Sequence, residues 1–203
     1  EQFTSQLFQE EMTGSTLNMH YTIADPKTFG ISEYEPVLPI YHSGQPEDSK
    51  KHCSDLLHRL DRIDPDRLSP ENAYTYRLLH RSLENDLALA DFPYYNEPLS
   101  PSSGMQSQLP VLLAEYTFRT KRDVTDYLAL LDQIDDYFAS LLLYEQEKAA
   151  AGFFMPACSS EKVRKQCDTI VTTEELAQGT HFLQTTFEDR LSELQKQGLV
   201  TPE

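Results

Sequence analysis

The residues with the clearest chemical potential are histidines that share a helical face with a carboxylate. His80 and Glu84 are spaced i, i+4, and His58 and Asp61 are spaced i, i+3, so each pair would project from one side of a helix. Zinc needs three or four converging ligands, together with side chains that orient them. Each pair offers only two. We therefore interpret both pairs as surface interactions and predict no metal ligand and no catalytic residue in this sequence.

Other hydrolase and nucleotide-binding motifs are absent from the sequence. No histidine is followed by glutamate, so the helical zinc motif does not occur, and there is no Gly-x-Ser-x-Gly turn or glycine-rich phosphate loop. Cys53 follows His52, but neighbouring residues on a helix point about 100° apart and cannot form a Cys-His dyad. These absences leave no cofactor to predict for the chain by itself.

A histidine and a tyrosine interrupt the apolar stretch from Leu17 to Ile23. His20 and Tyr21 lie side by side there, and Asp25-Pro26 closes the stretch. A lone buried histidine is more often a hydrogen-bonded core residue than a ligand. We expect His20 to be such a core residue, with a ligand role as the less favoured alternative.

Helical periodicity dominates the elements that must position these residues. Apolar residues recur at helical spacing, with start signals such as Ser69-Pro70 and Pro46. No alternating strand pattern and no internal repeat is found. The sequence predicts an all-α fold, an antiparallel array of six to eight helices with one long irregular loop over residues 92–110. The expected helices cover residues 3–14, 17–23, 46–63, 70–90, 111–118, 123–151, 161–171 and 181–196, with an extended loop over residues 36–46.

The longest expected helix runs from about Asp123 to Ala151, with Gly152 placed to end it. Its apolar stripe predicts that Leu131 lies deep in the core. The residues assigned to that stripe are Val124, Tyr127, Leu128, Leu131, Ile134, Phe138, Leu141 and Leu142.

Length and charge limit the possible partners. The 203 residues fit one domain, and the net charge of −16 argues against nucleic acid and anionic membranes. The sequence has no apolar run of the ~20 residues that a membrane span requires. The chain begins at Glu1 without methionine and ends at residues 201–203, directly after an expected helix. We expect residues 1–203 to be a single helical domain that was cut at a domain boundary.

Several short motifs together resemble one bacterial family. They are Leu17-x-x-His20-Tyr21-Thr22-x-x-Asp25-Pro26 with Gly30, Tyr94 to Leu99, Gly104-x-x-x-Gln108-Leu109-Pro110, Asp123-x-x-x-Tyr127-Leu128 and Gly152-x-x-Met155-Pro156. In order and spacing they are similar to the N-terminal part of the domain-of-unknown-function family 885. The resemblance implies a large helical, zinc-metallopeptidase-like protein, often exported as a lipoprotein, and therefore an extracellular or cell-envelope location. Its zinc helix would lie beyond residue 203, so zinc is expected only in the full-length protein.

Two hypotheses follow from different functional classes. In the first, the chain is the N-terminal helical region of a secreted zinc-dependent peptidase, not catalytic by itself, whose partners are its own C-terminal domain and a peptide substrate. In the second, it is a non-catalytic helical binding or structural module at the cell surface. For the first hypothesis, the aromatic, irregular loop from Tyr94 to Pro110 would wall the substrate cleft. The residues assigned to that wall are Tyr94, Tyr95, Gly104 and Gln108.

Overall fold

The computed structural model describes residues 1–42 and 45–200. The expected chain end at residues 201–203 and part of the predicted loop over residues 36–46 lie outside these ranges. The described residues form α1 (Gln2–Thr13), α2 (Thr16–Thr22), α3 (Gln45–Leu60), α4 (Pro70–Leu89), α5 (Met105–Glu115), α6 (Lys121–Asp132), α7 (Ile134–Ala150), α8 (Ala157–Ile170), α9 (Thr173–Gln178) and α10 (Phe182–Lys196). Three short 3-10 helices join them: η1 (Pro26–Phe29), η2 (Pro65–Arg67) and η3 (Pro93–Tyr95). The described ranges contain no β-strand, which confirms the all-α prediction.

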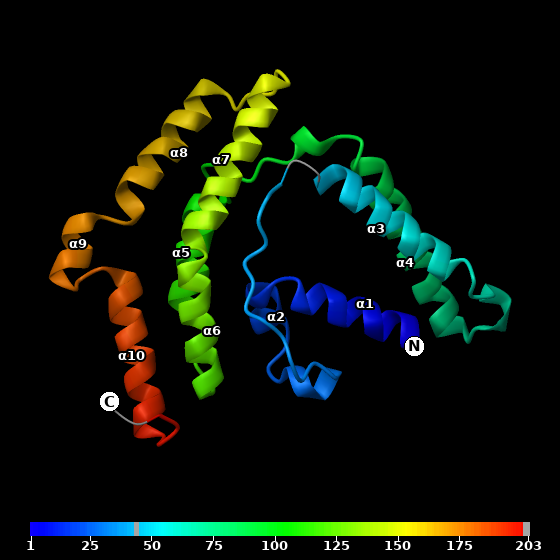
Figure 1. Ribbon diagram of the computed structural model, residues 1–203, viewed down its shortest axis with the longest axis horizontal. Coiled ribbons are helices and arrows are strands. Elements are labelled where there is room, and N and C mark those ends of the chain that lie inside the picture. Colours follow the sequence, from blue (N-terminus) through cyan, green and yellow to red (C-terminus); the bar gives the residue numbers. More distant parts are fainter. Residues whose placement is uncertain (43–44, 201–203) are drawn as a thin grey trace.

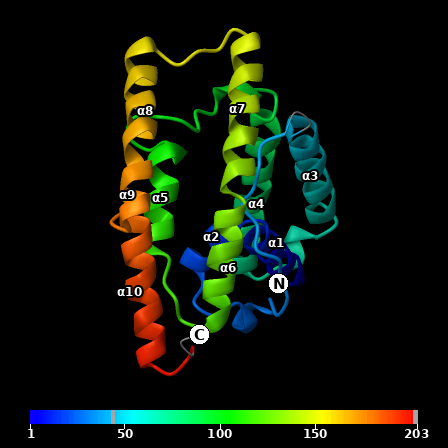
Figure 2. The ribbon, with the colours of Figure 1, turned by 60° about the vertical axis from the view of Figure 1, so that its left-hand side comes forward.

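The helices lie around a central rod made of α6 and α7 end to end (Figure 1). On one side, α8, α9 and α10 run back along this rod, antiparallel to it, as Figure 2 also shows. On the other side, α3 and α4 pack together as an antiparallel hairpin, with α1 beside it. The extended segment of residues 31–42 passes between the hairpin and the rod (Figure 1).

Several helix ends follow the signals in the sequence. The Ser69 hydroxyl accepts a hydrogen bond from the Asn72 N–H at 3.3 Å, and Pro70 is the first residue of α4. After α7, Gly152 has a φ of 88°. The Phe153 N–H donates to the carbonyl of Lys148 at 3.0 Å, which closes the last turn of the helix. Gly152 therefore ends this helix as predicted.

The helix predicted over residues 123–151 is divided at Gln133, and this prediction was wrong in its continuity. The Gln133 N–H donates to the carbonyl of Leu130, a tighter i−3 bond. Its side-chain amide donates to the carbonyls of Pro36 (3.0 Å) and Ala129 (2.9 Å), and accepts from the Leu38 N–H (2.9 Å). The break lets one glutamine bind the extended segment to the rod. It also raises the number of helices above six to eight, as does α9, which was not predicted.

The irregular loop is shorter than predicted. It ends at Gly104, because α5 begins at Met105 rather than at residue 111 and runs to Glu115. Pro110 lies within this helix and is buried. A proline there removes the bond that its N–H would make to the carbonyl of Gln106. The burial of Leu109 and Leu113, each 1% exposed, stabilises the helix despite this loss.

The largest group of buried apolar side chains joins the rod to α5 and α10. Its members are Leu17, Leu38, Leu109, Leu113, Tyr116, Phe118, Tyr127, Leu130, Tyr137, Leu141 and Leu194. A second group surrounds Met19, and a third lies inside the α3–α4 hairpin. Leu131 is only partly buried, whereas Leu128 and Leu142 are 46% and 59% exposed. The other residues of the predicted stripe lie in this core or pack against it, so the prediction was wrong for Leu128, for Leu142 and for the depth of Leu131.

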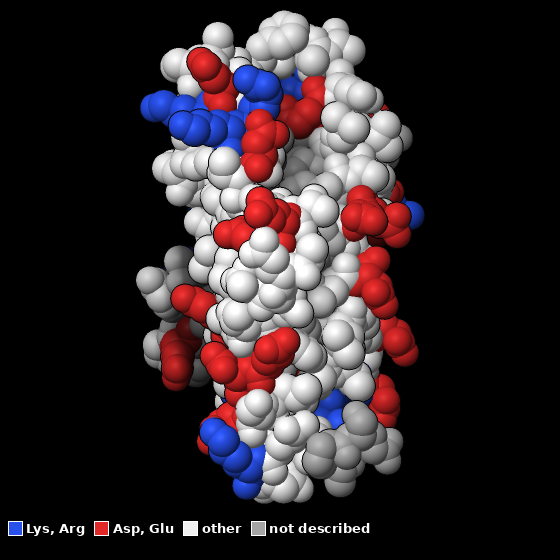
Figure 3. Space-filling view, turned by 90° about the vertical axis from the view of Figure 1, so that its left-hand side faces the viewer, with Lys and Arg blue, Asp and Glu red and all other residues white. Residues whose placement is uncertain are grey.

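Carboxylates dominate the face made by the last three helices. Figure 3 shows Asp and Glu spread along most of its length, with Lys and Arg gathered mainly toward the two ends. Among the described residues, no helix combines the length and apolar character needed to cross a membrane.

Candidate functional site

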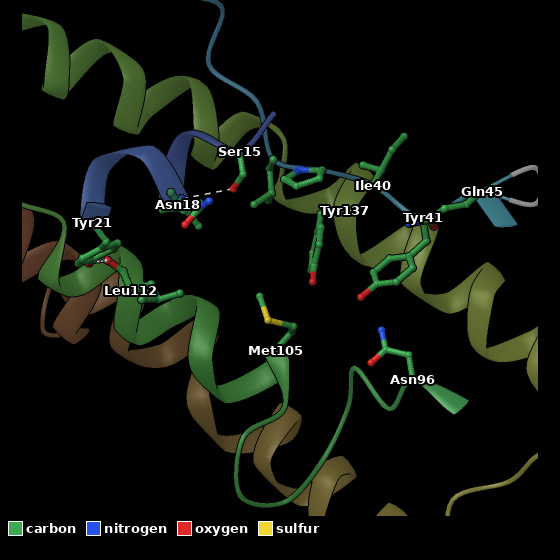
Figure 4. Close-up of a pocket in the computed structure, with 13 residues that line it drawn as sticks. Ser15, Asn18, Tyr21, Ile40, Tyr41, Gln45, Asn96, Met105, Leu112 and Tyr137 are labelled. Carbon is green, nitrogen blue, oxygen red and sulfur yellow. Dashed lines mark hydrogen bonds between the residues drawn. The ribbon is translucent and has the colours of Figure 1, made fainter. Parts of the chain in front are cut away.

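A groove of about 530 Å³ lies between α2, the extended segment, the start of α5 and α7 (Figure 4). Apolar and aromatic side chains form most of its wall. Apart from its tyrosines, the wall has four residues with a hydroxyl or amide group: Ser15, Asn18, Gln45 and Asn96. A mainly apolar groove with a few polar groups is typical of a binding site for a small organic molecule or a peptide.

Side chains from α2, from α7 and from the junction of α6 and α7 hold the extended wall of this groove. The Thr16 hydroxyl accepts from the Val37 N–H at 2.8 Å, and the Ser140 hydroxyl accepts from the Tyr41 N–H at 3.1 Å. Gln133 binds Leu38, as described above. Thr16 and Ser140 are both buried, so water does not compete for these bonds. The groove is thus formed by a fixed segment of backbone.

Two tyrosines form the part of the wall nearest the rod. The hydroxyls of Tyr41 and Tyr137 both point into the opening, with Asn96 and Met105 across from them (Figure 4). Burial raises the pKa of both phenols above the usual value for tyrosine. They therefore remain neutral at physiological pH and offer hydrogen-bonding groups rather than charge.

The four residues expected to wall a cleft are placed differently from one another. Tyr94 lines a smaller cavity beside the groove, and Tyr95 is 73% exposed. Gly104 is buried at the start of α5, and Gln108 is exposed on the same helix. None of the four lines the larger groove. Their role toward a substrate stays a prediction. Asn96, which follows Tyr95, lines both cavities.

Gly104 has a steric role that predicts a stability effect. A Cβ at this position would lie 2.2 Å from the backbone nitrogen of Ser100 and 2.6 Å from its carbonyl oxygen. These atoms cannot rotate away, so Gly104→Ala is expected to lower the free energy of unfolding by about 2 kcal/mol, measured by urea denaturation. Ser102→Ala, an exposed change in the same turn, should cost less than about 0.5 kcal/mol. Equal stability of the two variants would contradict the steric argument.

His20 is a buried, hydrogen-bonded histidine, as expected. It is 7% exposed, and its Nε2 accepts from the Thr117 N–H at 3.1 Å. Its ring stacks on Tyr116 with centroids 3.6 Å apart. Burial, and next the positive charge of Arg119, lowers the pKa of His20 to about 4, although Asp123 opposes this shift. Tyr21 is instead 45% exposed and donates to the carbonyl of Leu112 at 2.6 Å.

The depressed pKa of His20 predicts a loss of stability in weak acid. The unfolded chain binds a proton at His20 below its ordinary pKa of 6.5, while the folded chain stays neutral there down to about 4. Stability therefore falls as the pH drops through this window, by about 1.5 kcal/mol between pH 6.5 and pH 5. His20→Gln keeps an acceptor for Thr117 but cannot titrate. Urea denaturation at several pH values should show that the wild type loses stability relative to the variant as the pH falls. If the free energies of unfolding of both proteins changed with pH in parallel, His20 would not be the origin of the loss.

The histidine–carboxylate pairs do not make a metal centre. His80 Nδ1 lies 3.5 Å from Glu84 Oε1, and its Nε2 lies 3.2 Å from Asp61 Oδ1. The two carboxylates face opposite nitrogens of the ring, so they do not converge on one point. No group of three His, Cys, Asp or Glu side chains that could hold a metal ion occurs within residues 1–42 and 45–200. Within those ranges the His and carboxylate pairs therefore fall short of the three converging protein ligands of a catalytic zinc site.

Sequence reasoning missed most of the groove. Tyr41, Tyr137 and Met105 were not predicted as site residues. Tyr137 and Met105 fit the apolar pattern of a helix face, and that pattern carries no signal for binding. A weak signal exists only for Tyr41, which follows Leu38-Pro39-Ile40 in a proline-rich segment. The groove depends on contacts between elements about a hundred residues apart, such as that of Tyr41 with Ser140.

Comparison with known proteins gives one result. A family model described as "Bacterial protein of unknown function (DUF885)" matches residues 27–200. Searches of curated proteins and of solved structures found no match. The matched region covers the extended segment, α3 to α10 and most of the groove wall. The chain belongs to the DUF885 family of bacterial proteins.

Proposed function

We propose that this chain is the N-terminal helical region of a secreted, zinc-dependent peptidase-like protein, and that its groove holds part of a peptide substrate. The observation that carries the proposal is the groove of about 530 Å³, with its fixed extended wall and neutral tyrosines. Apolar walls would accept side chains, while Asn18 and Asn96 could bond to peptide groups. Zinc chemistry, in this proposal, belongs to a C-terminal region of the full-length protein, and the location outside the cell rests on the family resemblance.

The proposal is tested by measuring, through fluorescence anisotropy, how tightly the chain binds short, end-blocked peptides of mixed sequence. Ile40 lines the groove and is 52% exposed, so Ile40→Glu should fold normally and weaken binding by about tenfold or more, the equivalent of about 1.4 kcal/mol. Leu143→Glu is the matched control, because Leu143 is 61% exposed on α7 and does not line the groove. Equal weakening by both variants, or no peptide binding at all, would refute a peptide site in the groove.

The second hypothesis, a non-catalytic binding module, predicts the same binding result but a different full-length protein. The two are separated by the coding sequence that follows residue 203. A downstream His-Glu zinc helix favours the peptidase, whereas a stop codon or an unrelated domain favours the binding module. A peptidase assay of the full-length protein then tests the first hypothesis directly, with loss of cleavage in Ile40→Glu as the expected result.

A further inference from the structure

A smaller pocket of about 160 Å³ adjoins the groove. It lies between the start of α3, the end of α4, η3 and α7, and it shares Tyr41, Gln45 and Asn96 with the groove. Its own wall adds Tyr94, Tyr144 and Glu147. The pocket therefore combines three aromatic rings and one carboxylate in a small volume.

The three tyrosines form one contiguous wall. The ring centroids of Tyr41 and Tyr144 are 5.0 Å apart, and those of Tyr94 and Tyr144 are 6.1 Å apart. The Tyr144 hydroxyl lies 2.8 Å from the carbonyl oxygen of Pro93 and 3.1 Å from that of Asn96. This phenol donates to backbone acceptors, which ties α7 to the turn that carries Tyr94. The central ring is thus held in place without a ligand.

The electrostatic surroundings of the pocket favour a positive ligand. Glu147 lines it, and the two nearby lysines are already paired with other carboxylates. Lys50 Nζ lies 2.5 Å from Asp91, and Lys148 Nζ lies 2.7 Å from Glu97. His42, also at the wall, faces Asp48 at 3.9 Å. Among the described residues, neither of these two lysines is left to pair with Glu147.

We propose that this pocket binds an alkylammonium cation, which would lie against the tyrosine wall and beside Glu147. Aromatic rings attract such cations through their electron-rich faces, and several rings with a carboxylate are a known way to hold quaternary ammonium groups. Two sources share this chemistry: the amine of a lysine side chain in a peptide, and a free quaternary amine. The inference goes beyond the peptide proposal and does not depend on it, because a free amine would also fit.

The test is a calorimetric or NMR titration of the chain with cations and their uncharged isosteres. The cations are choline and N-acetyl-lysine methylamide; their neutral counterparts are 3,3-dimethylbutan-1-ol and N-acetyl-norleucine methylamide. At least one cation should bind about fivefold or more tightly than its counterpart. Preference for choline assigns a free quaternary amine, and preference for the lysine derivative assigns a peptide side chain. Equal affinity of cation and isostere, or no binding of either cation, would overturn the proposal.

Variants place the binding at this pocket. Tyr94→Leu and Glu147→Gln should each weaken cation binding by between about twofold and thirtyfold, while Tyr94→Phe should keep most of it. The control for Tyr94 is Tyr95→Leu, since Tyr95 is 73% exposed in the same turn and does not line the pocket. Asp136→Asn, an exposed change on α7, controls for net charge.

If Tyr94→Leu does not fold, the exposed Glu147→Gln still decides the matter, and unchanged cation affinity in that variant would refute the site. Loss of peptide binding in Ile40→Glu with cation binding intact would separate the two proposals.

Discussion

Replacing Arg190 with methionine is expected to lower the free energy of unfolding by about 3 kcal/mol. Arg190 lies on α10, and its Nη1 donates to the carbonyls of Leu113 (3.0 Å) and Tyr116 at the end of α5, where the Leu113 carbonyl also accepts from the Tyr116 N–H at 3.4 Å. Its Nε donates to the carbonyl of Thr186 at 2.8 Å. Each buried acceptor that loses its partner costs about 1–3 kcal/mol. Methionine fills much of the same volume but offers no donor.

The arginine also packs on two aromatic rings. Its guanidinium carbon lies 4.6 Å from the ring centroid of Phe118 and 5.0 Å from that of Tyr127. A planar group stacks on rings and donates in several directions at once, which an ammonium group cannot do. Arg190→Lys is therefore expected to recover less than half of the lost stability. Both variants are measured by urea denaturation, with an unchanged m-value as the check that the unfolding transition is comparable.

Arg77→Met serves as the control. Arg77 lies 6.0 Å from the ring of Tyr74, which is 58% exposed, so this change should alter stability by less than about 0.5 kcal/mol. If Arg190→Met cost no more than Arg77→Met, or if Arg190→Lys restored full stability, Arg190 would not be a specific link between α10 and the end of α5.

These links show which features a single sequence can specify. Helix ends that depend on near neighbours were predictable: Ser69 caps α4 through Asn72, three residues away, and Gly152 ends α7. The bond from Arg190 to Leu113 joins residues 77 positions apart. No local pattern marks an arginine on one amphipathic helix as the partner of carbonyls on another. The all-α class was therefore accessible, but the connections between helices were not.

The division of the long helix has the same origin. Residues 123–151 carry a continuous helical pattern with no proline or glycine, so nothing local predicts a break. At the break, the Gln133 side chain binds backbone groups of Pro36 and Leu38. Those residues belong to a segment whose path the sequence does not specify. The groove inherits this limit, because its wall is that same segment.

Leu130→Ala is expected to cost about 2–5 kcal/mol, the range for removing a large buried aliphatic side chain. Leu130 is 1% exposed and packs in the main apolar core with Tyr127 and Tyr137. Leu131, which the sequence pattern placed in the core, is only partly buried at its edge. Leu131→Ala should cost clearly less, by about 1 kcal/mol or more, because solvent or neighbouring side chains fill the space more easily.

The comparison of these two adjacent leucines tests which face of α6 is buried. The predicted stripe placed Leu131 on the buried face together with Tyr127, Ile134 and Phe138. In the structure, the fully buried residues of α6 and α7 include Tyr127, Leu130, Tyr137 and Leu141, and Leu131 lies beside that line. Urea denaturation of the two alanine variants distinguishes these phases. A larger loss for Leu131→Ala would favour the predicted stripe and would contradict this packing of α6. A larger loss for Leu130→Ala is expected, because Leu130 lies in the core that α6 shares with α5 and α10. Leu131 lies at the edge of that core, although the pattern of apolar residues placed it inside.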